Sequence, residues 1–286
     1  MKKIKDYMAH TITIIDDNQS SSGGIKGVST GFTEFDKITS GLYQGQLIVI
    51  GGCSSMGTSI FAMNIIENVA LLSKKYVCVF SLDMTANSLI QRMLSSIGEI
   101  DQNKMRTGCL NNDELNRLTN ASILLSQSNI MIDDSSIITT KDIQKKIEML
   151  NIIYDIELVV IDFLQLIKPV FISESCDSYI SEIMKELKLI AKKLNLILIV
   201  LSDVKVEVES RLNKRPMLTD LNSEGMVSKY ADLVLFVYRD IIYNYELTDK
   251  DTAEIIIEKY RYGITGNFKL RFIGCYCKFE NNDSVQ

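Results

Sequence analysis

The segment from Gly52 to Ser59 reads Gly-Cys-Ser-Ser-Met-Gly-Thr-Ser and constrains the fold of this chain more than any other feature. It follows an apolar run, Leu47–Ile50, and precedes a helical pattern, which is the strand–loop–helix context of a phosphate-binding loop. In the pattern G-x-x-x-x-G-K-[ST], backbone N–H groups surround phosphates, a lysine reaches the terminal ones, and a hydroxyl holds Mg²⁺. Only the lysine is absent here, and Thr58 replaces it. We therefore expect a nucleotide-binding loop without its cation, formed by Gly52, Cys53, Ser54, Ser55, Met56, Gly57, Thr58 and Ser59. The alternative is a relic of the fold whose glycines serve only the tight turn.

Short apolar runs alternate with helical segments along most of the chain. Five runs are rich in β-branched or aromatic residues and carry almost no charge, as is typical of strands buried on both faces of a parallel sheet: Leu47–Ile50, Val77–Leu82, Leu158–Ile161, Leu196–Leu201 and Leu233–Val237. Between them, five segments have helical periodicity: Ser59–Leu72, Ser88–Ile97, Asp113–Ser126, Lys141–Leu150 and Tyr179–Leu194. Near the C-terminus, three runs joined by glycines predict antiparallel strands: Ala253–Glu258, Asn267–Phe272 and Cys275–Phe279. We therefore predict an α/β fold with a mostly parallel sheet, flanking helices and an antiparallel C-terminal edge.

The composition narrows the class of protein. A chain of 286 residues with 46% apolar and 23% charged residues fits one globular domain with a short extension. We expect a cytoplasmic protein without a membrane partner, because no uncharged apolar run reaches about 18 residues. A net charge of −5 gives no general attraction to nucleic acid, so any contact with DNA requires a local basic face. Six cysteines without a C-x-x-C pair, and a single histidine, do not predict a zinc site, and Cys275 and Cys277 are expected to share a buried strand face.

The first 25 residues differ from the rest. A helical pattern extends to about Asp17 and is followed by a polar, Ser- and Gly-rich tether. A single helix on a tether cannot bury its apolar stripe alone, so we expect it to dock elsewhere on this chain or on a neighbour. The expected organisation is a linker helix and tether over residues 1–25, a single domain over 26–280, and a tail over 281–286.

An acidic residue, Asp162, directly follows the apolar run Leu158–Ile161. Ligands bind at the carboxyl edge of an open parallel sheet, where this run ends. We therefore expect Ser59 and Asp162 to hold Mg²⁺, directly or through water. The alternative is that Asp162 only terminates the strand.

Taken together, these segments resemble the RecA-like motor domain of bacterial replicative DNA helicases of the DnaB type. The resemblance extends over about residues 27–279 and is carried by nine segments: Gly27–Phe32, Ser55–Gly57, Phe61–Asn64, Phe80–Met84, Arg106–Gly108, Ile132–Ser136, Ile161–Leu166, Lys214–Pro216 and Tyr238–Asp240. It implies a P-loop NTPase core that uses ATP and Mg²⁺, and a hexameric ring that moves along single-stranded DNA. We expect no counterpart of the family's N-terminal collar domain in this sequence, and expect only a segment like its linker helix, Lys5–Asp16, before the motor.

Three positions that the resemblance assigns to ATP hydrolysis depart from the family pattern. The P-loop lysine falls on Thr58, the catalytic glutamate that orients the attacking water falls on Asp83, and the glutamine that senses the γ-phosphate falls on Asp203. The alternative for Asp83 is a helix N-terminal acid that stabilises the turn before Ser88.

Two further sets of residues are assigned by the resemblance. Lys259 and Arg261 match the finger residues that reach into the neighbouring subunit's ATP, although Arg261 could equally be a solvated charge at a strand end. The family's Asp-Leu-Arg-Glu-Ser-Gly segment, which contacts the DNA backbone, reads Asp-Leu-Asn-Ser-Glu-Gly at residues 220–225. Together with the basic loop that precedes it, this segment contains five residues that are candidates for contact with DNA: Arg211, Lys214, Arg215, Asn222 and Gly225. The alternative is that these residues form a solvated surface.

These departures weaken the predicted ATP site. A charge-assisted hydrogen bond contributes on the order of 1.5–3 kcal/mol, so the loss of lysine at Thr58 lowers phosphate affinity about 10- to 150-fold. Asp83 is one methylene shorter than glutamate, and a misplacement of about 1 Å can cost about 10² in rate. A carboxylate of Asp203 at about 4 Å from the γ-phosphate repels it by roughly 4 kcal/mol at an effective dielectric constant near 20. We therefore expect slow or absent ATP turnover by this chain alone.

Three functions follow from these expectations. The first is a helicase-family enzyme of DNA replication. The second is a non-hydrolysing ring subunit or accessory replication protein, which joins helicase subunits in a homo- or hetero-hexamer and donates Arg261 in trans. The third is a nucleotide-binding scaffold with no DNA role.

Overall fold

The computed structural model describes residues 4, 8, 12, 25–169, 176–221, 226–244, 246 and 250–282. The helix and tether expected over residues 1–25 lie almost entirely outside the described residues. So do Asn222, Gly225 and positions 283–286 of the tail.

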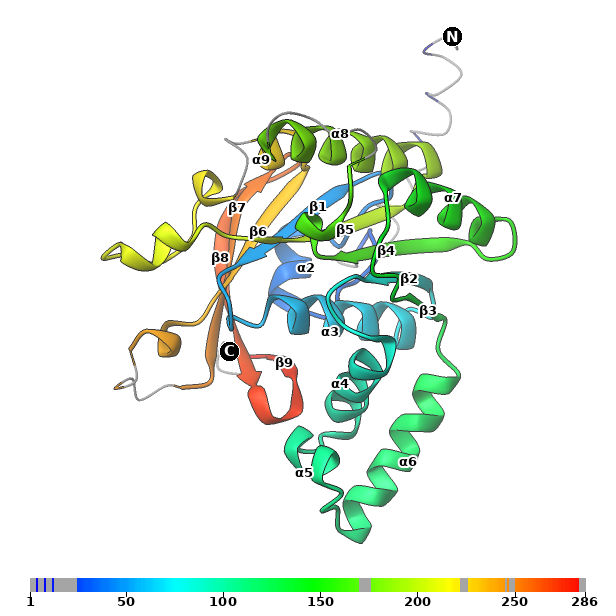
Figure 1. Ribbon diagram of the computed structural model, residues 1–286, viewed down its shortest axis with the longest axis vertical. Coiled ribbons are helices and arrows are strands. Elements are labelled where there is room, and N and C mark those ends of the chain that lie inside the picture. The colour runs from blue at the N-terminus through cyan, green and yellow to red at the C-terminus, as the bar shows by residue number, and fades with distance from the viewer. Residues whose placement is uncertain are drawn as a thin grey trace.

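The described strands form a single mixed sheet (Figure 1). They are β1 (Leu47–Gly52), β2 (Tyr76–Ser81), β3 (Ile130–Asp133), β4 (Ile156–Asp162), β5 (Ile197–Asp203), β6 (Leu233–Tyr238), β7 (Thr252–Tyr260), β8 (Gly266–Ile273) and β9 (Lys278–Asn281). Their order is β3-β2-β4-β5-β1-β6-β7-β8-β9. The strands from β3 to β6 pair in parallel, and β7, β8 and β9 continue the sheet antiparallel. The predicted fold class, with its antiparallel C-terminal edge, is confirmed.

Helices cover both faces of the sheet. They are α2 (Thr33–Thr39), α3 (Thr58–Leu71), α4 (Ala86–Gly98), α5 (Gln102–Thr107), α6 (Asn112–Ser126), α7 (Thr140–Asn151), α8 (Cys176–Leu194) and α9 (Met226–Tyr230). In Figure 1, α7, α8 and α9 lie on one side of the sheet and α2 and α3 on the other, while α4, α5 and α6 project as a separate lobe. Over the part of the chain that the structure describes, no helix is both long enough and apolar enough to span a membrane.

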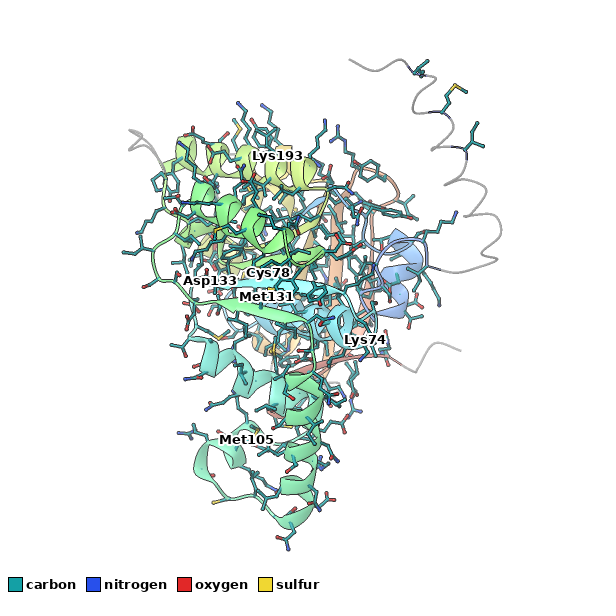
Figure 2. All side chains as sticks on the ribbon, turned by 90° about the vertical axis from the view of Figure 1, so that its right-hand side faces the viewer. Lys74, Cys78, Met105, Met131, Asp133 and Lys193 are labelled. Carbon is teal, nitrogen blue, oxygen red and sulfur yellow. The ribbon has the colours of Figure 1, made fainter. Side chains whose placement is uncertain are left out.

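The apolar runs in the sequence correctly predicted the central strands. The five runs predicted as parallel strands correspond to β1, β2, β4, β5 and β6, within a residue or two at each end. The five predicted helices correspond to α3, α4, α6, α7 and α8. The sixth parallel strand, β3, was not predicted, because it has only four residues and each is partly exposed at the edge of the sheet. Figure 2 looks onto this edge, with Met131 and Asp133 in front and Met105 on the projecting lobe below.

The prediction for the last strand was wrong at its start. Gly274–Tyr276 form a 3₁₀ turn, η5, and Cys277 adopts the left-handed conformation with φ 51°, so β9 begins only at Lys278. As a result, Cys275 and Cys277 do not share a buried face. Cys277 is buried and Cys275 is exposed.

The C-terminal strand packs directly on α3, the helix that follows the phosphate-binding loop. The Phe279 ring lies 5.5 Å from the Phe61 ring in an edge-to-face arrangement. The Phe279 N–H donates to the side-chain oxygen of Asn64 at 2.8 Å. The antiparallel edge and the first helix of the parallel core therefore form one packed unit.

Candidate nucleotide-binding site

The loop from Gly52 to Ser59 joins the end of β1 to the start of α3 and lines a cavity of about 590 Å³. Gly57 precedes α3 with φ 94°, and a Cβ at this position would lie 3.1 Å from the Phe279 ring, so glycine is strongly favoured there. The free N–H groups of the first turn of α3 lie at this end of the cavity. Met56 is the exception in the loop, because it does not line the cavity. Its side chain is buried, and its sulfur accepts a hydrogen bond from the Arg239 N–H at 3.2 Å.

Strand register brings the predicted carboxylates to this loop. Asp203 at the end of β5 lies opposite Gly52, and Asp162 at the end of β4 lies opposite Ser81. Asp83 follows Ser81 by two residues and, like Asp203, lines the cavity. The carboxyl edge of the parallel sheet therefore gathers three acidic residues around one loop.

The two expected metal ligands are adjacent. The Ser59 hydroxyl donates to Asp162 Oδ1 at 3.3 Å, and Asp162 is almost entirely buried. Burial, together with the charges of Asp83 and Asp203, raises the pKa of Asp162 to about 7, against the hydrogen bond from Ser59. A hydroxyl and a carboxylate beside a phosphate-binding loop are the oxygen ligands that Mg²⁺ uses in P-loop proteins, so these residues fit that ion. Their role as metal ligands remains a prediction.

The acidic residues leave the cavity with little positive charge. Burial, followed by the charge of Asp83, raises the pKa of Asp203. The Asp203 N–H donates to Gln165 Oε1 at 3.4 Å, and Gln165 Nε2 donates to the Ser202 hydroxyl at 3.1 Å. The Thr85 side chain caps α4 and Asp83 lies two residues before it, so both roles expected for Asp83 stay predictions.

The side chain at the lysine position does not extend along the loop. A Cβ at Gly52 would lie 2.4 Å from Thr58 Oγ1, which shows how closely the threonine packs against the end of β1. Thr58 is buried and carries no charge. Its hydroxyl therefore cannot supply the electrostatic interaction that a lysine ammonium provides.

Two arginines near the loop were not predicted as site residues. Arg92, from α4, is the only lysine or arginine among the described residues that line the cavity. The sequence indicated this position of Arg92 only weakly. Arg92 is a charged residue next to Met93 and three residues after Leu89, both of which are buried. Arg239, directly after β6, donates from Nη1 to the Ser55 carbonyl at 3.2 Å and lies 3.9 Å from the Phe272 ring centroid. Burial lowers the pKa of Arg239.

The predicted finger residues lie away from this cavity. Lys259 Nζ donates to the carbonyls of Ser228 and Ala231 at 2.6 and 2.7 Å, and burial lowers its pKa. Arg261 lies 3.3 Å from the buried Asp232, but its side chain is 63% exposed. Neither finger residue lines this chain's own nucleotide cavity.

The basic residues proposed to contact DNA are held by neighbours within the chain. Arg211 pairs with Asp220 at 2.6 Å, and Arg215 pairs with Glu254 at 2.7 Å. Lys214 Nζ lies 4.3 Å from the centroid of the Tyr243 ring. The described structure therefore gives no basic cluster free of internal partners at these three positions.

Solved structures share this fold closely. One, the structure of an ATPase domain, superposes with a TM-score of 0.92 and 32% identity, covering 97% of this chain and 99% of that one. A DnaB-like replicative helicase, described with its interactions with primase, superposes with a TM-score of 0.90 and 32% identity, covering 99% of this chain and 68% of that one. The expected RecA-like core is confirmed.

Comparisons of the sequence agree with the structural comparisons. The replicative DNA helicase DnaB of Geobacillus stearothermophilus is 40% identical over 98% of this chain, and the replicative DNA helicase DnaC of Bacillus subtilis is 39% identical over 98%. The chain spans 62% of the length of each of these relatives. A family model described as the DnaB-like helicase C terminal domain matches residues 27–281. The chain therefore belongs to the DnaB-like helicase C-terminal domain family.

Proposed function

We propose that this chain is the nucleotide-binding motor portion of a DnaB-type replicative helicase assembly, with slow or absent ATP turnover of its own. The observation that supports this most strongly is the charge of the cavity. Asp83 and Asp203 line it and Asp162 lies beside it, while the lysine position carries Thr58. Binding of a triphosphate therefore depends on Mg²⁺ and on the backbone N–H groups of the loop.

Hydrolysis is more sensitive than binding to these substitutions. The γ-phosphoryl transfer needs a well-placed water and positive charge on the equatorial oxygens. Asp83 is too short to occupy the position of a glutamate carboxylate, and Asp203 adds negative charge where a neutral amide is expected. The two changes act on the transition state, so they lower the rate even when ATP is bound.

The test restores the three family residues together. The Thr58→Lys, Asp83→Glu, Asp203→Gln variant is expected to hydrolyse ATP at least about 10²-fold faster than the unmodified chain, with single-stranded DNA and Mg²⁺ present. A control variant that carries Asp155→Asn, immediately before β4 and far from the loop, should match the unmodified chain. Rapid DNA-stimulated hydrolysis by the unmodified chain would contradict the proposal.

A second function is favoured by the position of the finger residues. The exposed Arg261 side chain lies outside this chain's own cavity, where a neighbouring subunit could receive it. In this case the chain joins complete helicase subunits in a mixed ring and stabilises the transition state of a partner's ATP. Mixing this chain with a complete relative should then give an ATPase rate that falls when Arg261→Ala is introduced. An unchanged rate in the mixed complex would exclude this role.

A scaffold without a DNA role makes a different prediction. Contacts with phosphates release counterions, so true binding of single-stranded DNA weakens steeply as salt rises. Binding titrations across a salt series should show this dependence if the chain acts on DNA. Absence of DNA binding at low salt would favour the scaffold.

A further inference from the structure

The nucleotide cavity contains one basic side chain that the described structure leaves unused. Arg92 lies on α4 and lines the cavity together with Thr58, Ser59 and Cys277. It is half-buried there, and it is the only lysine or arginine among the described residues that line the cavity. Arg92 therefore shares this cavity with the phosphate-binding loop and with Cys277, directly before β9.

Arg92 differs in this respect from the other arginine near the loop. Arg239 is occupied by the Ser55 carbonyl and by the face of the Phe272 ring. Arg92, by contrast, forms no hydrogen bond, ion pair or ring contact with any residue that the structure describes. The donors of this half-buried arginine are therefore available to a ligand that supplies acceptor oxygens.

We propose that Arg92 binds the terminal phosphate of the nucleotide and replaces the cation that is missing at Thr58. The inference rests on the proposed nucleotide-binding function. Arg92 lines the same cavity as Thr58 and Ser59, the positions at which P-loop proteins contact the terminal phosphates and hold Mg²⁺. A guanidinium offers two parallel N–H donors to phosphate oxygens, so one arginine can satisfy an anion that a lysine would contact as a point charge.

The arrangement also explains how a cavity with so many acids could hold a triphosphate. Asp83 and Asp203 lie on the strand-end side of the cavity, and Arg92 approaches from α4. A cation from α4 offsets the carboxylates at the phosphate end, which Thr58 cannot do. This gives the chain a different source of positive charge for the same ligand.

The test is isothermal titration of the full chain with ATP and with ADP, each in the presence of Mg²⁺. Arg92→Ala and the longer neutral variant Arg92→Gln should both weaken ATP binding about 10- to 150-fold, and should weaken ADP binding less. Thr58→Lys introduced into the Arg92→Ala variant should recover most of the lost ATP affinity, because it returns a cation to the same phosphates. Arg271→Ala is the matched control, since that guanidinium is more than half exposed and lies 3.8 Å from an exposed Asp251.

The possible outcomes separate the two proposals. Failure of the unmodified chain to bind ATP would overturn the proposed function, and this inference with it. Tight ATP binding by the unmodified chain that is unchanged in both Arg92 variants would overturn this inference alone. Equal losses for ATP and ADP, or no recovery with Thr58→Lys in a variant that melts at the unmodified temperature, would also overturn it.

Discussion

The Ser59 hydroxyl lies 3.3 Å from Asp162 Oδ1, joining the first turn of α3 to the end of β4 across 103 residues of sequence. This pair sets the place expected for Mg²⁺ beside the phosphate-binding loop. The resemblance assigns a lysine and a glutamate to the positions of Thr58 and Asp83. The expected metal end of the site therefore matches the family pattern better than the expected hydrolytic end.

Asp162→Asn should remove the Mg²⁺ dependence of ATP binding. The amide keeps the size of the carboxylate but loses the charge that attracts the ion, so ATP affinity in Mg²⁺ should fall by about tenfold or more. Titrations with and without Mg²⁺ should then give the same affinity. Asp155→Asn, exposed immediately before the same strand, should leave the Mg²⁺ effect intact, and a persistent Mg²⁺ effect in Asp162→Asn would contradict the assignment.

The ion pairs of Asp232 should have unequal effects on stability. Asp232 is fully buried, accepts from the Leu47 N–H at 2.9 Å, and pairs with both Lys188 and Arg261. Lys188→Met should lower the free energy of unfolding by about 3–5 kcal/mol, because the exposed arginine is then the one remaining ion-pair partner of the buried carboxylate among the described residues. Arg261→Ala should cost less than about 1 kcal/mol, since this side chain is mostly exposed.

Urea unfolding of the two variants measures this difference. Equal losses would show that the two cations are equivalent partners of Asp232. A small loss for Arg261→Ala has a practical consequence, because this variant can then be used in mixed complexes without concern for its folding.

Glu67 should make the stability of the protein depend on pH. It is buried on α3, and burial raises its pKa from 4.5 to about 8, although hydrogen bonds from Ser96 and Asn64 oppose the shift. Between these pH values the folded state holds a proton that the unfolded state has lost, so the free energy of unfolding falls as pH rises from about 4.5 to about 8. At about 1.4 kcal/mol per pKa unit, the total effect is at most on the order of 5 kcal/mol.

Glu67→Gln should abolish the part of the pH dependence of stability that comes from Glu67. The amide is neutral at every pH and preserves the shape of the side chain, so the variant should be more stable than the unmodified chain at about pH 9 and similar to it at about pH 5. Thermal or urea unfolding at the two pH values checks this. An unchanged slope of stability against pH in the variant would show that Glu67 is already charged in the folded state.

Phe279→Ala should destabilise the protein and also disturb the nucleotide loop. The ring is almost fully buried, packs against Phe61, and would be the first group met by a Cβ at Gly57, so its loss should cost about 3–5 kcal/mol. At temperatures where the variant remains folded, its ATP affinity should fall. Tyr276→Ala, in the turn before β9, is the comparison, and equal ATP affinity in both variants would contradict a link between this ring and the loop.

The sequence predicted the parallel core well because buried strands produce uninterrupted apolar runs. The run Leu158–Ile161 followed by Asp162 contains both a strand and the acidic residue at its carboxyl end, so the position of that carboxylate followed directly. β3 was missed because a short edge strand is half exposed and has no such run. The start of β9 was misplaced because the left-handed conformation of Cys277 is unusual for a residue other than glycine.

The site was harder to predict than the sheet. The loop and the acids at strand ends are set by local sequence, and register then brings them together. Arg92 is placed by the packing of α4 against the rest of the molecule, and no local pattern marks an arginine on a helix flank as part of a cavity. No pattern of spacing connects Arg211 with Asp220 or Arg215 with Glu254, so these ion pairs were likewise not predicted.

The packing of Phe279 over Gly57 joins an early segment of the chain to a late one. A ribosome makes the loop long before it makes Phe279, so the loop has no supporting ring through most of the synthesis of the domain. The packing of this loop is therefore completed late, and a product that terminates before Phe279 would carry the loop sequence without the aromatic ring that lies beside Gly57.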